Sequence, residues 1–167
     1  YQMHIKATAS KSYSEDLAQI GLIKINLGQR TSAYQLWTQG LQKDARHPYG
    51  AYASGLMLNS YHRGKQWPSL EHLSRLCLKA NIAPLFNQTR LNTKELLGLA
   101  LYYGGKEHFA QGRFQLAYQK LAEHVQNYGH TLEHDESFFY LTLAYWKARK
   151  HDHTEQRRQA TDRGRQA

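Results

Sequence analysis

The segment from His130 to His134 matches the pattern H-x-x-E-H, which is typical of zinc peptidases whose two histidines bind the metal beside a general-base glutamate. Such a site needs a third protein ligand, and Glu155 is the best candidate among the residues that follow. The segment leads directly into Asp135 and Glu136, and acids suit the first turn of a helix. We therefore interpret it as a polar loop before a helix and keep a metallohydrolase only as the third hypothesis.

The sequence offers little else for catalysis. His151 and His153 resemble a surface chelating pair, but histidines in polar turns need no metal to explain them. The residues from Gly104 to Lys106 lack the spacing of a phosphate-binding loop. Cys77 has apolar neighbours at helical spacing, which predicts a small buried side chain rather than a reactive thiol. We therefore predict no enzyme activity, no cofactor and no metal site.

Composition favours one all-α domain over the whole chain, residues 1–167. The chain has 167 residues, of which 41% are hydrophobic and three are prolines, and helix-forming residues outnumber β-branched ones. The formal net charge of +9 is concentrated at the two ends, and such a surface attracts acidic protein, nucleic acid or anionic lipid.

The start of the chain bears on its location. No apolar run is long enough to span a membrane and no signal peptide is visible. Because the chain opens at Tyr1 rather than Met, we expect a fragment or a processed form with an upstream segment, such as an anchor, removed. We expect a soluble domain and leave the cytoplasm and the periplasm open.

A repeated pattern organises the sequence. Gly28 and Gly64 each lie between two helical runs, and Pro48 and Pro84 follow the second run of each pair, so that both glycines and both prolines are 36 residues apart. Gly112 opens a third copy, delayed by a polar loop at 84–92. The pattern predicts about four helix hairpins, over residues 14–48, 50–84, 93–128 and 135–165, the last with a turn near 151–153.

Two local features remain open in the third copy. Its turn lies either at Gly104-Gly105 or at Gly112, and we prefer Gly112 because of the residues that follow it. Asn92 or Thr93 is a good N-cap for the first helix of this copy.

The segment Gly112-Arg113-Phe114-Gln115-Leu116-Ala117 resembles the turn and second-helix start of a tetratricopeptide repeat. In that family positions 8 and 20 are small and position 24 is large. Counted from the glycines, position 8 of the three copies is Gly21, Met57 and Gly105. Position 20 is Ala33, Ser69 and Ala117, and position 24 is Trp37, Leu73 and Leu121. The fourth copy departs from the pattern, with Gln156 and Ala160 at positions 20 and 24. The resemblance implies a right-handed superhelix of stacked antiparallel helix hairpins.

In that family ligands usually lie along the concave surface formed by the first helices. The positions that face it are, in this sequence, Gln19, Asn26, Tyr61, His62, Tyr102, Tyr103, Lys106, Tyr145 and Arg149. This set is aromatic with basic additions, which suits an acidic or extended peptide. The resemblance therefore implies a non-enzymatic scaffold or adaptor that binds a partner protein, as part of a larger bacterial protein or envelope assembly.

A second class of function is the sensing or oligomerisation domain of a transcription regulator. The basic ends leave nucleic-acid contact open, although we do not favour it. Homo-oligomers that form through an exposed end of the repeat stack are also left open.

Overall fold

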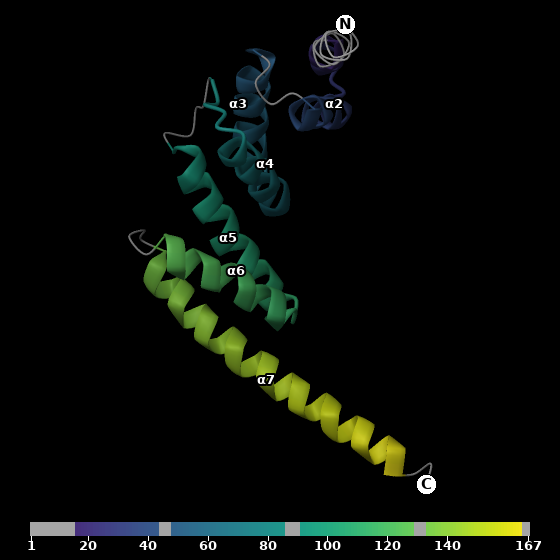
Figure 1. Cartoon of the computed structure of the whole chain (residues 1–167), viewed down its shortest axis with the longest axis vertical. Coiled ribbons are helices and arrows are strands. Elements are labelled where there is room, and N and C mark those ends of the chain that lie inside the picture. Colours follow the sequence, from purple (N-terminus) through teal and green to yellow (C-terminus); the bar gives the residue numbers. More distant parts are fainter. Residues whose placement is uncertain (1–15, 44–47, 86–90, 129–132, 165–167) are drawn as a thin grey trace, which may run out of the picture. The chain divides into compact units, whose positions relative to one another are not determined.

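The described part of the chain is helical throughout (Figure 1). The structure, a computed structural model, describes residues 16–43, 48–85, 91–128 and 133–164. Its helices are residues 16–26, α2 (Arg30–Lys43), α3 (Pro48–Arg63), α4 (Trp67–Lys79), α5 (Thr93–Ala110), α6 (Phe114–Asn127) and α7 (His134–Gly164). These residues include no β-strand, so the predicted all-α class is confirmed.

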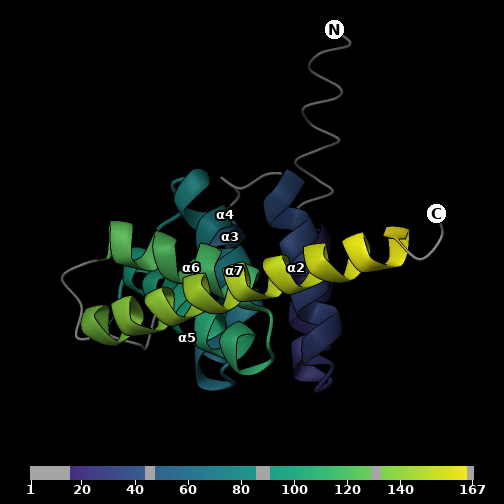
Figure 2. The same cartoon turned by 90° about the horizontal axis from the view of Figure 1, so that it is seen from below.

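The helices belong to two compact units, Tyr1–Leu97 and Gly98–Ala167. In the first unit α2 packs against α3, and α3 packs against α4. In the second unit α6 packs along the first part of α7 (Figures 1 and 2). Each of these pairs is consecutive in sequence, and α5 crosses the boundary between the two units. The extension of one domain over both units stays a prediction.

The three tight turns share one backbone arrangement. At each turn a residue with positive φ follows the first helix, and these residues are Gly28 at 74°, Lys65 at 51° and Gly112 at 73°. The amide of that residue donates to the carbonyl three residues back, at 3.0, 3.1 and 3.0 Å. The next amide donates to the carbonyl five residues back, at 2.8, 2.9 and 2.9 Å. This is the Schellman arrangement, which satisfies the last carbonyls of a helix.

The third turn confirms the preferred reading of the sequence. The helix α5 runs without interruption through Gly104-Gly105, and the chain reverses at Gly112. Its start is also as predicted: the Asn92 side chain accepts from the Glu95 amide at 2.9 Å, and the Glu95 carboxylate accepts from the Asn92 amide at 2.7 Å. This reciprocal pair is a capping box, which makes Asn92 the N-cap.

The second turn differs from the other two in the type of its positive-φ residue. Its positive-φ residue is Lys65, one residue after the Gly64 on which the sequence alignment rested. Counted from Lys65, positions 20 and 24 of the repeat fall on Leu70 and Ser74, and both are fully buried. The residue that takes the left-handed conformation is therefore one position later than the glycine from which the repeat positions were counted. The assignment of repeat positions in this hairpin stays a prediction, since Met57 and Leu73 are also buried.

We predict that Lys65→Gly raises the free energy of unfolding by up to about 1 kcal/mol, because a side chain at positive φ is strained and glycine is not. Urea denaturation followed by circular dichroism would measure it. The matched control is Gly112→Ala, where an added Cβ meets nothing within 4 Å, so that any loss reports the backbone alone. A loss of stability in Lys65→Gly would contradict the shared turn geometry.

The fourth hairpin is not formed. The helix α7 continues from His134 to Gly164, through the predicted turn at residues 151–153 (Figure 2). A turn of the kind seen at Gly28 and Gly112 needs a residue that readily adopts positive φ, and residues 147–163 contain neither Gly nor Pro. Glu, Gln, Arg and Ala in this stretch favour helix instead. The described chain thus has three hairpins followed by one long helix.

Glycines allow close approach within two hairpins. A Cβ on Gly21 would overlap the Trp37 indole, whose Nε1 donates to the Ala18 carbonyl at 3.1 Å. A Cβ on Gly105 would lie 2.7 Å from Cγ of Leu121. The residues at repeat positions 8 and 24 are therefore in close contact in the first and third hairpins.

Candidate functional site

The residues predicted to line a groove are divided between the two units. The first unit holds Gln19, Asn26, Tyr61 and His62, and the second holds Tyr102, Tyr103, Lys106, Tyr145 and Arg149. All but one are exposed or partly buried. The exception is Tyr102, which is 2% exposed and belongs to the core of the second unit. Partner binding by the other eight stays a prediction.

Tyr102 and Lys106 hold α5 to α7. The Tyr102 hydroxyl donates to Oε2 of Glu136, and Nζ of Lys106 lies 2.6 Å from Oε1 of the same carboxylate. Nζ of Lys106 also donates to the Tyr102 hydroxyl at 3.2 Å and lies 5.0 Å from the centroid of the Tyr140 ring. Hydrogen bonds from Lys106 and Tyr102 lower the pKa of Glu136, and burial, followed by the Glu136 bond, raises the pKa of Tyr102 to about 12. Both groups are thus engaged in an internal network.

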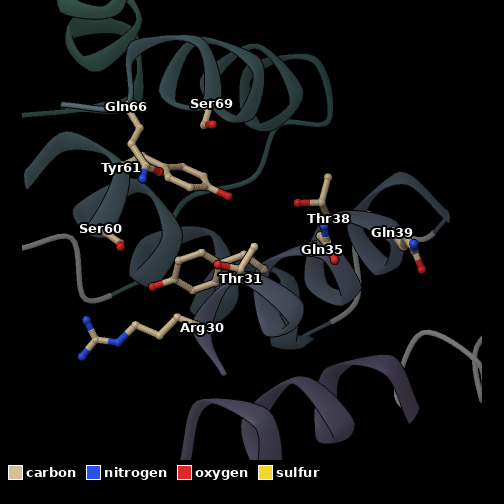
Figure 3. Close-up of a pocket in the computed structure, with 10 residues that line it drawn as sticks. Arg30, Thr31, Gln35, Thr38, Gln39, Ser60, Tyr61, Gln66 and Ser69 are labelled. Atoms are coloured by element: carbon tan, nitrogen blue, oxygen red, sulfur yellow. The ribbon is translucent and has the colours of Figure 1, made fainter. Parts of the chain in front are cut away.

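The first unit contains a hollow of about 730 Å³ formed by α2, the end of α3 and the start of α4. Figure 3 shows its lining side chains coming from these three segments, with the Arg30 guanidinium at one end. They are Arg30, Thr31, Tyr34, Gln35, Thr38, Gln39, Ser60, Tyr61, Gln66 and Ser69. Of the residues predicted from sequence, only Tyr61 is among them.

A second hollow of about 530 Å³ adjoins the first, because the two share Arg30, Tyr34 and Ser60. Its other lining residues are Ile25, Leu56, Asn59, Arg63 and Gly64. Among the described residues that line the two hollows, Arg30 and Arg63 are the charged ones, and none is an Asp, Glu, His or Cys. The charge that the described lining residues carry is therefore positive.

The lining side chains suit recognition of a peptide. Amide and hydroxyl groups both donate and accept hydrogen bonds, as the main chain of an extended peptide also does. The rings of Tyr34 and Tyr61 meet edge to face at 5.6 Å and provide an apolar wall. Burial, with a smaller contribution from Tyr34, raises the pKa of Tyr61, so its hydroxyl remains a neutral donor.

A sequence signal for this site was present but was not used. Thr31, Gln35, Thr38 and Gln39 recur at spacings of four, three and one along α2, which places hydroxyl and amide groups on one side of the helix. The family resemblance directed attention to the first helix of each hairpin, whereas these residues lie on a second helix.

The side chains that are most capable of catalysis do not form a reactive site among the described residues. Cys77 is buried, as predicted, and burial raises its pKa to about 11. Residues 130–132 of the H-x-x-E-H segment lie outside the described residues, while His134 is within 3.6 Å of the Asp135 carboxylate. Among the described residues no group of three or more His, Cys, Asp or Glu is placed to hold a metal ion.

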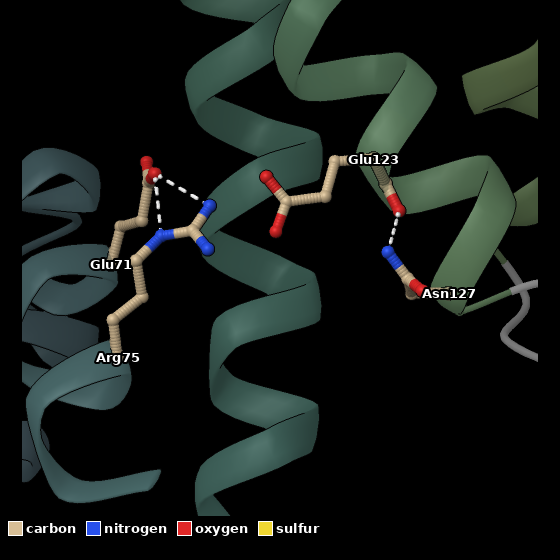
Figure 4. Close-up of polar contacts among 4 residues, drawn as sticks. All are labelled: Glu71, Arg75, Glu123 and Asn127. Atoms are coloured by element: carbon tan, nitrogen blue, oxygen red, sulfur yellow. Dashed lines mark hydrogen bonds and ion pairs between the residues drawn. The ribbon is translucent and has the colours of Figure 1, made fainter. Parts of the chain in front are cut away.

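Two further polar contacts are local to single helices (Figure 4). Arg75 donates to Oε1 of Glu71 through Nε at 3.2 Å and Nη2 at 3.1 Å within α4. Nδ2 of Asn127 donates to the Glu123 carbonyl at 3.1 Å at the end of α6. Such i,i+4 contacts on a helix surface contribute a few tenths of a kcal/mol, roughly, and they define no site.

Comparison with protein-family models, with curated proteins and with solved structures finds no match to this chain. None of the helices in the described ranges combines the length and the apolar character needed to cross a membrane. The site must therefore be interpreted from its own geometry.

Proposed function

We propose that this chain is a non-enzymatic binding module that recognises an extended peptide segment of a partner protein. The site proposed is the hollow between α2, α3 and α4, together with the adjoining hollow. The observation that carries the proposal is the lining itself. Its described residues surround about 730 Å³ with amides, hydroxyls, two tyrosine rings and the Arg30 guanidinium, and none of them carries a carboxylate, imidazole or thiol.

The proposed architecture is a right-handed superhelix of tetratricopeptide-like hairpins. Support comes from the three identical turns at Gly28, Lys65 and Gly112. Further support comes from the close contact of Gly21 with Trp37 and of Gly105 with Leu121. Stacked hairpins of this kind offer long, semi-rigid binding surfaces.

The peptide proposed carries a negative charge beside an apolar side chain. Arg30 is exposed at the end of the hollow, and its guanidinium can bind a carboxylate in two-point geometry. The edge between Tyr34 and Tyr61 would hold the apolar group. The net charge of +9 would speed the approach of such a segment.

Selection from a displayed library of random peptides would test this function. We expect the selected peptides to be acidic and to bind Tyr34→Ala at least about 10-fold more weakly, because tyrosines are frequent binding hot spots. Arg30→Gln should weaken binding less and should reduce its dependence on salt. Fluorescence anisotropy would give the dissociation constants.

Tyr103→Ala is the matched control, since it removes a partly exposed tyrosine from the second unit. Circular dichroism must show that Tyr34→Ala still folds, and Gln35→Ala provides a milder change at an exposed lining position. Loss of binding in Tyr103→Ala but not in Tyr34→Ala would favour the groove of first helices instead. Failure to select any peptide, or steeply salt-dependent binding to duplex DNA, would count against the proposal.

A further inference from the structure

The first half of α7 carries four aromatic rings that are about half exposed. The Tyr145 ring lies 5.8 Å from the Tyr118 ring of α6, and Lys147 and Lys150 lie over the Trp146 ring at 5.5 and 5.4 Å. Phe138 is 58% exposed, Phe139 59%, Tyr145 47% and Trp146 56%. Along an α-helix, with 100° per residue, these four rings fall on one side together with Asp135, Thr142 and Arg149. The opposite side is the packed one, where Ser137 and Ala144 are fully buried. We call the seven residues 135, 138, 139, 142, 145, 146 and 149 the outer face of α7.

The outer face is symmetric about Thr142. Three positions before it is Phe139 and three after it is Tyr145, while four before it is Phe138 and four after it is Trp146. The same reflection sets Asp135, seven positions before, against Arg149, seven positions after. Rings thus mirror rings, and an acid mirrors a base.

Such a pattern is self-complementary in one arrangement. When two identical helices pack antiparallel around a two-fold axis, the residue before the central position faces the residue equally far after it on the other copy. With the axis at Thr142, rings would pack on rings and each Asp135 would face an Arg149. The threonine is the smallest side chain on the face and lies where the two backbones come closest.

The charges cannot satisfy one another within one copy. Asp135 and Arg149 are 14 positions apart, or about 21 Å along the helix axis. The Asp135 side chain is fully exposed, and its carboxylate lies 3.6 Å from Nδ1 of His134. Arg149 donates to the Tyr145 hydroxyl at 3.0 Å and lies over its ring, which orients the guanidinium on the outer face. A second copy would place an Arg149 opposite each Asp135.

We propose that the outer face of α7 is the interface of a homodimer, in which two α7 helices pack antiparallel and cross near Thr142. A shallow crossing of about 20° keeps both charged ends in contact. The four rings, each about half exposed, offer roughly 300–500 Å² of apolar surface per copy. This is a modest interface, and we expect dissociation in the micromolar range. The proposal does not depend on peptide binding by the first unit.

A second copy is a better occupant than an anionic membrane. The fully exposed Asp135 carboxylate lies on the same side of α7 as the rings and would be repelled by acidic lipid. The repulsion between two copies that each carry a net charge of +9 is weak at long range, because physiological salt screens charges beyond about 8 Å. Where the two copies meet, each Asp135 faces the Arg149 of the other copy.

Sedimentation equilibrium of the full chain would test the proposal. We expect a reversible monomer–dimer equilibrium that Trp146→Ala weakens by more than about 30-fold. Asp135→Arg and Arg149→Asp should each weaken the dimer about tenfold, since both symmetric pairs become like-charged. An equimolar mixture of these two variants should recover the wild-type affinity as a heterodimer, in which every charged pair is opposite again. Lys94→Glu, a charge reversal at an exposed position of α5, is the control and should change little.

Cross-linking locates the axis. In a Cys77→Ala background, Thr142→Cys should form a disulfide between copies readily, because the residue faces itself across the axis. Lys147→Cys, which the helical rotation turns away from this face, should not. A wild-type chain that stays monomeric up to roughly millimolar concentration would overturn the proposal. So would a dimer that the mixed variants fail to restore, or a monomer that binds anionic vesicles through Trp146.

Discussion

Tyr102→Ala should lower the free energy of unfolding by about 3–5 kcal/mol, whereas Tyr103→Ala should cost about 1 kcal/mol or less. The two rings are adjacent in sequence and in contact, with centroids 4.7 Å apart. Tyr102 is 2% exposed and packs with Ala117, Leu121 and Ala144, while Tyr103 is 36% exposed. The first change leaves a cavity in the core of the second unit and the second does not. Urea denaturation followed by circular dichroism would measure both.

Tyr102→Phe separates the ring from its hydroxyl. This variant keeps the packing and loses the bond to Glu136, so it should be less damaging than Tyr102→Ala. Because the pKa of Glu136 is lowered in the folded chain, the bond to its carboxylate contributes fully above the ordinary glutamate pKa of about 4.3. That contribution is lost as the pH falls through the folded-state pKa. The difference between wild type and Tyr102→Phe should therefore shrink in acid, and equal losses in Tyr102→Ala and Tyr103→Ala would contradict the core position of Tyr102.

The turns at Gly28 and Gly112 show what the sequence could reveal. Glycine has no steric cost at positive φ, so a glycine between two helical runs marks a reversal reliably. The residue at the second turn could not be predicted in this way, because Lys65 takes the left-handed conformation although Gly64 is next to it. The sequence does not show which residue ends a helix where two candidates are adjacent, and Leu70, Leu73 and Ser74 after this turn are all buried. A strain of about 1 kcal/mol is small compared with the free energy gained by burying such a core.

The end of the chain was mispredicted for a related reason. A repeat pattern with three copies suggests a fourth, but a hairpin forms only where the chain can both turn and bury a second helix. Residues 147–163 contain no glycine or proline, and their composition is polar and helix-forming. The continuous α7 leaves its outer face, with Phe138 and Trp146, without the cover that a second helix would have given.

The hollow in the first unit could not be predicted from the sequence, for a different reason. Its lining comes from α2, α3 and α4, and only their packing brings Thr31, Tyr61 and Gln66 together. Periodicity could have placed the hydroxyl and amide groups of α2 on one side of that helix. It could not have shown that the end of α3 and the start of α4 leave space opposite them.

Trp37→Ala should destabilise the first unit by about 3–5 kcal/mol. The indole is 3% exposed, fills the space left by the absent side chain of Gly21, and donates to the Ala18 carbonyl at 3.1 Å. Gly21→Ala in the wild-type background should also destabilise, by about 1–3 kcal/mol, because the new methyl group overlaps the indole.

The effect of Gly21→Ala on stability should change sign once the Trp37 indole has been removed. In a Trp37→Ala background, Gly21→Ala no longer meets a ring, and alanine in a helix interior is favoured over glycine by about 1 kcal/mol. The double variant should therefore be more stable than Trp37→Ala alone, which is a coupling that only direct contact produces. Gly105→Ala and Leu121→Ala provide the same cycle in the third hairpin, where the Cβ would lie 2.7 Å from Cγ. Additive effects in both cycles would mean that positions 8 and 24 do not touch, and the stacking proposed for these hairpins would lose its physical basis.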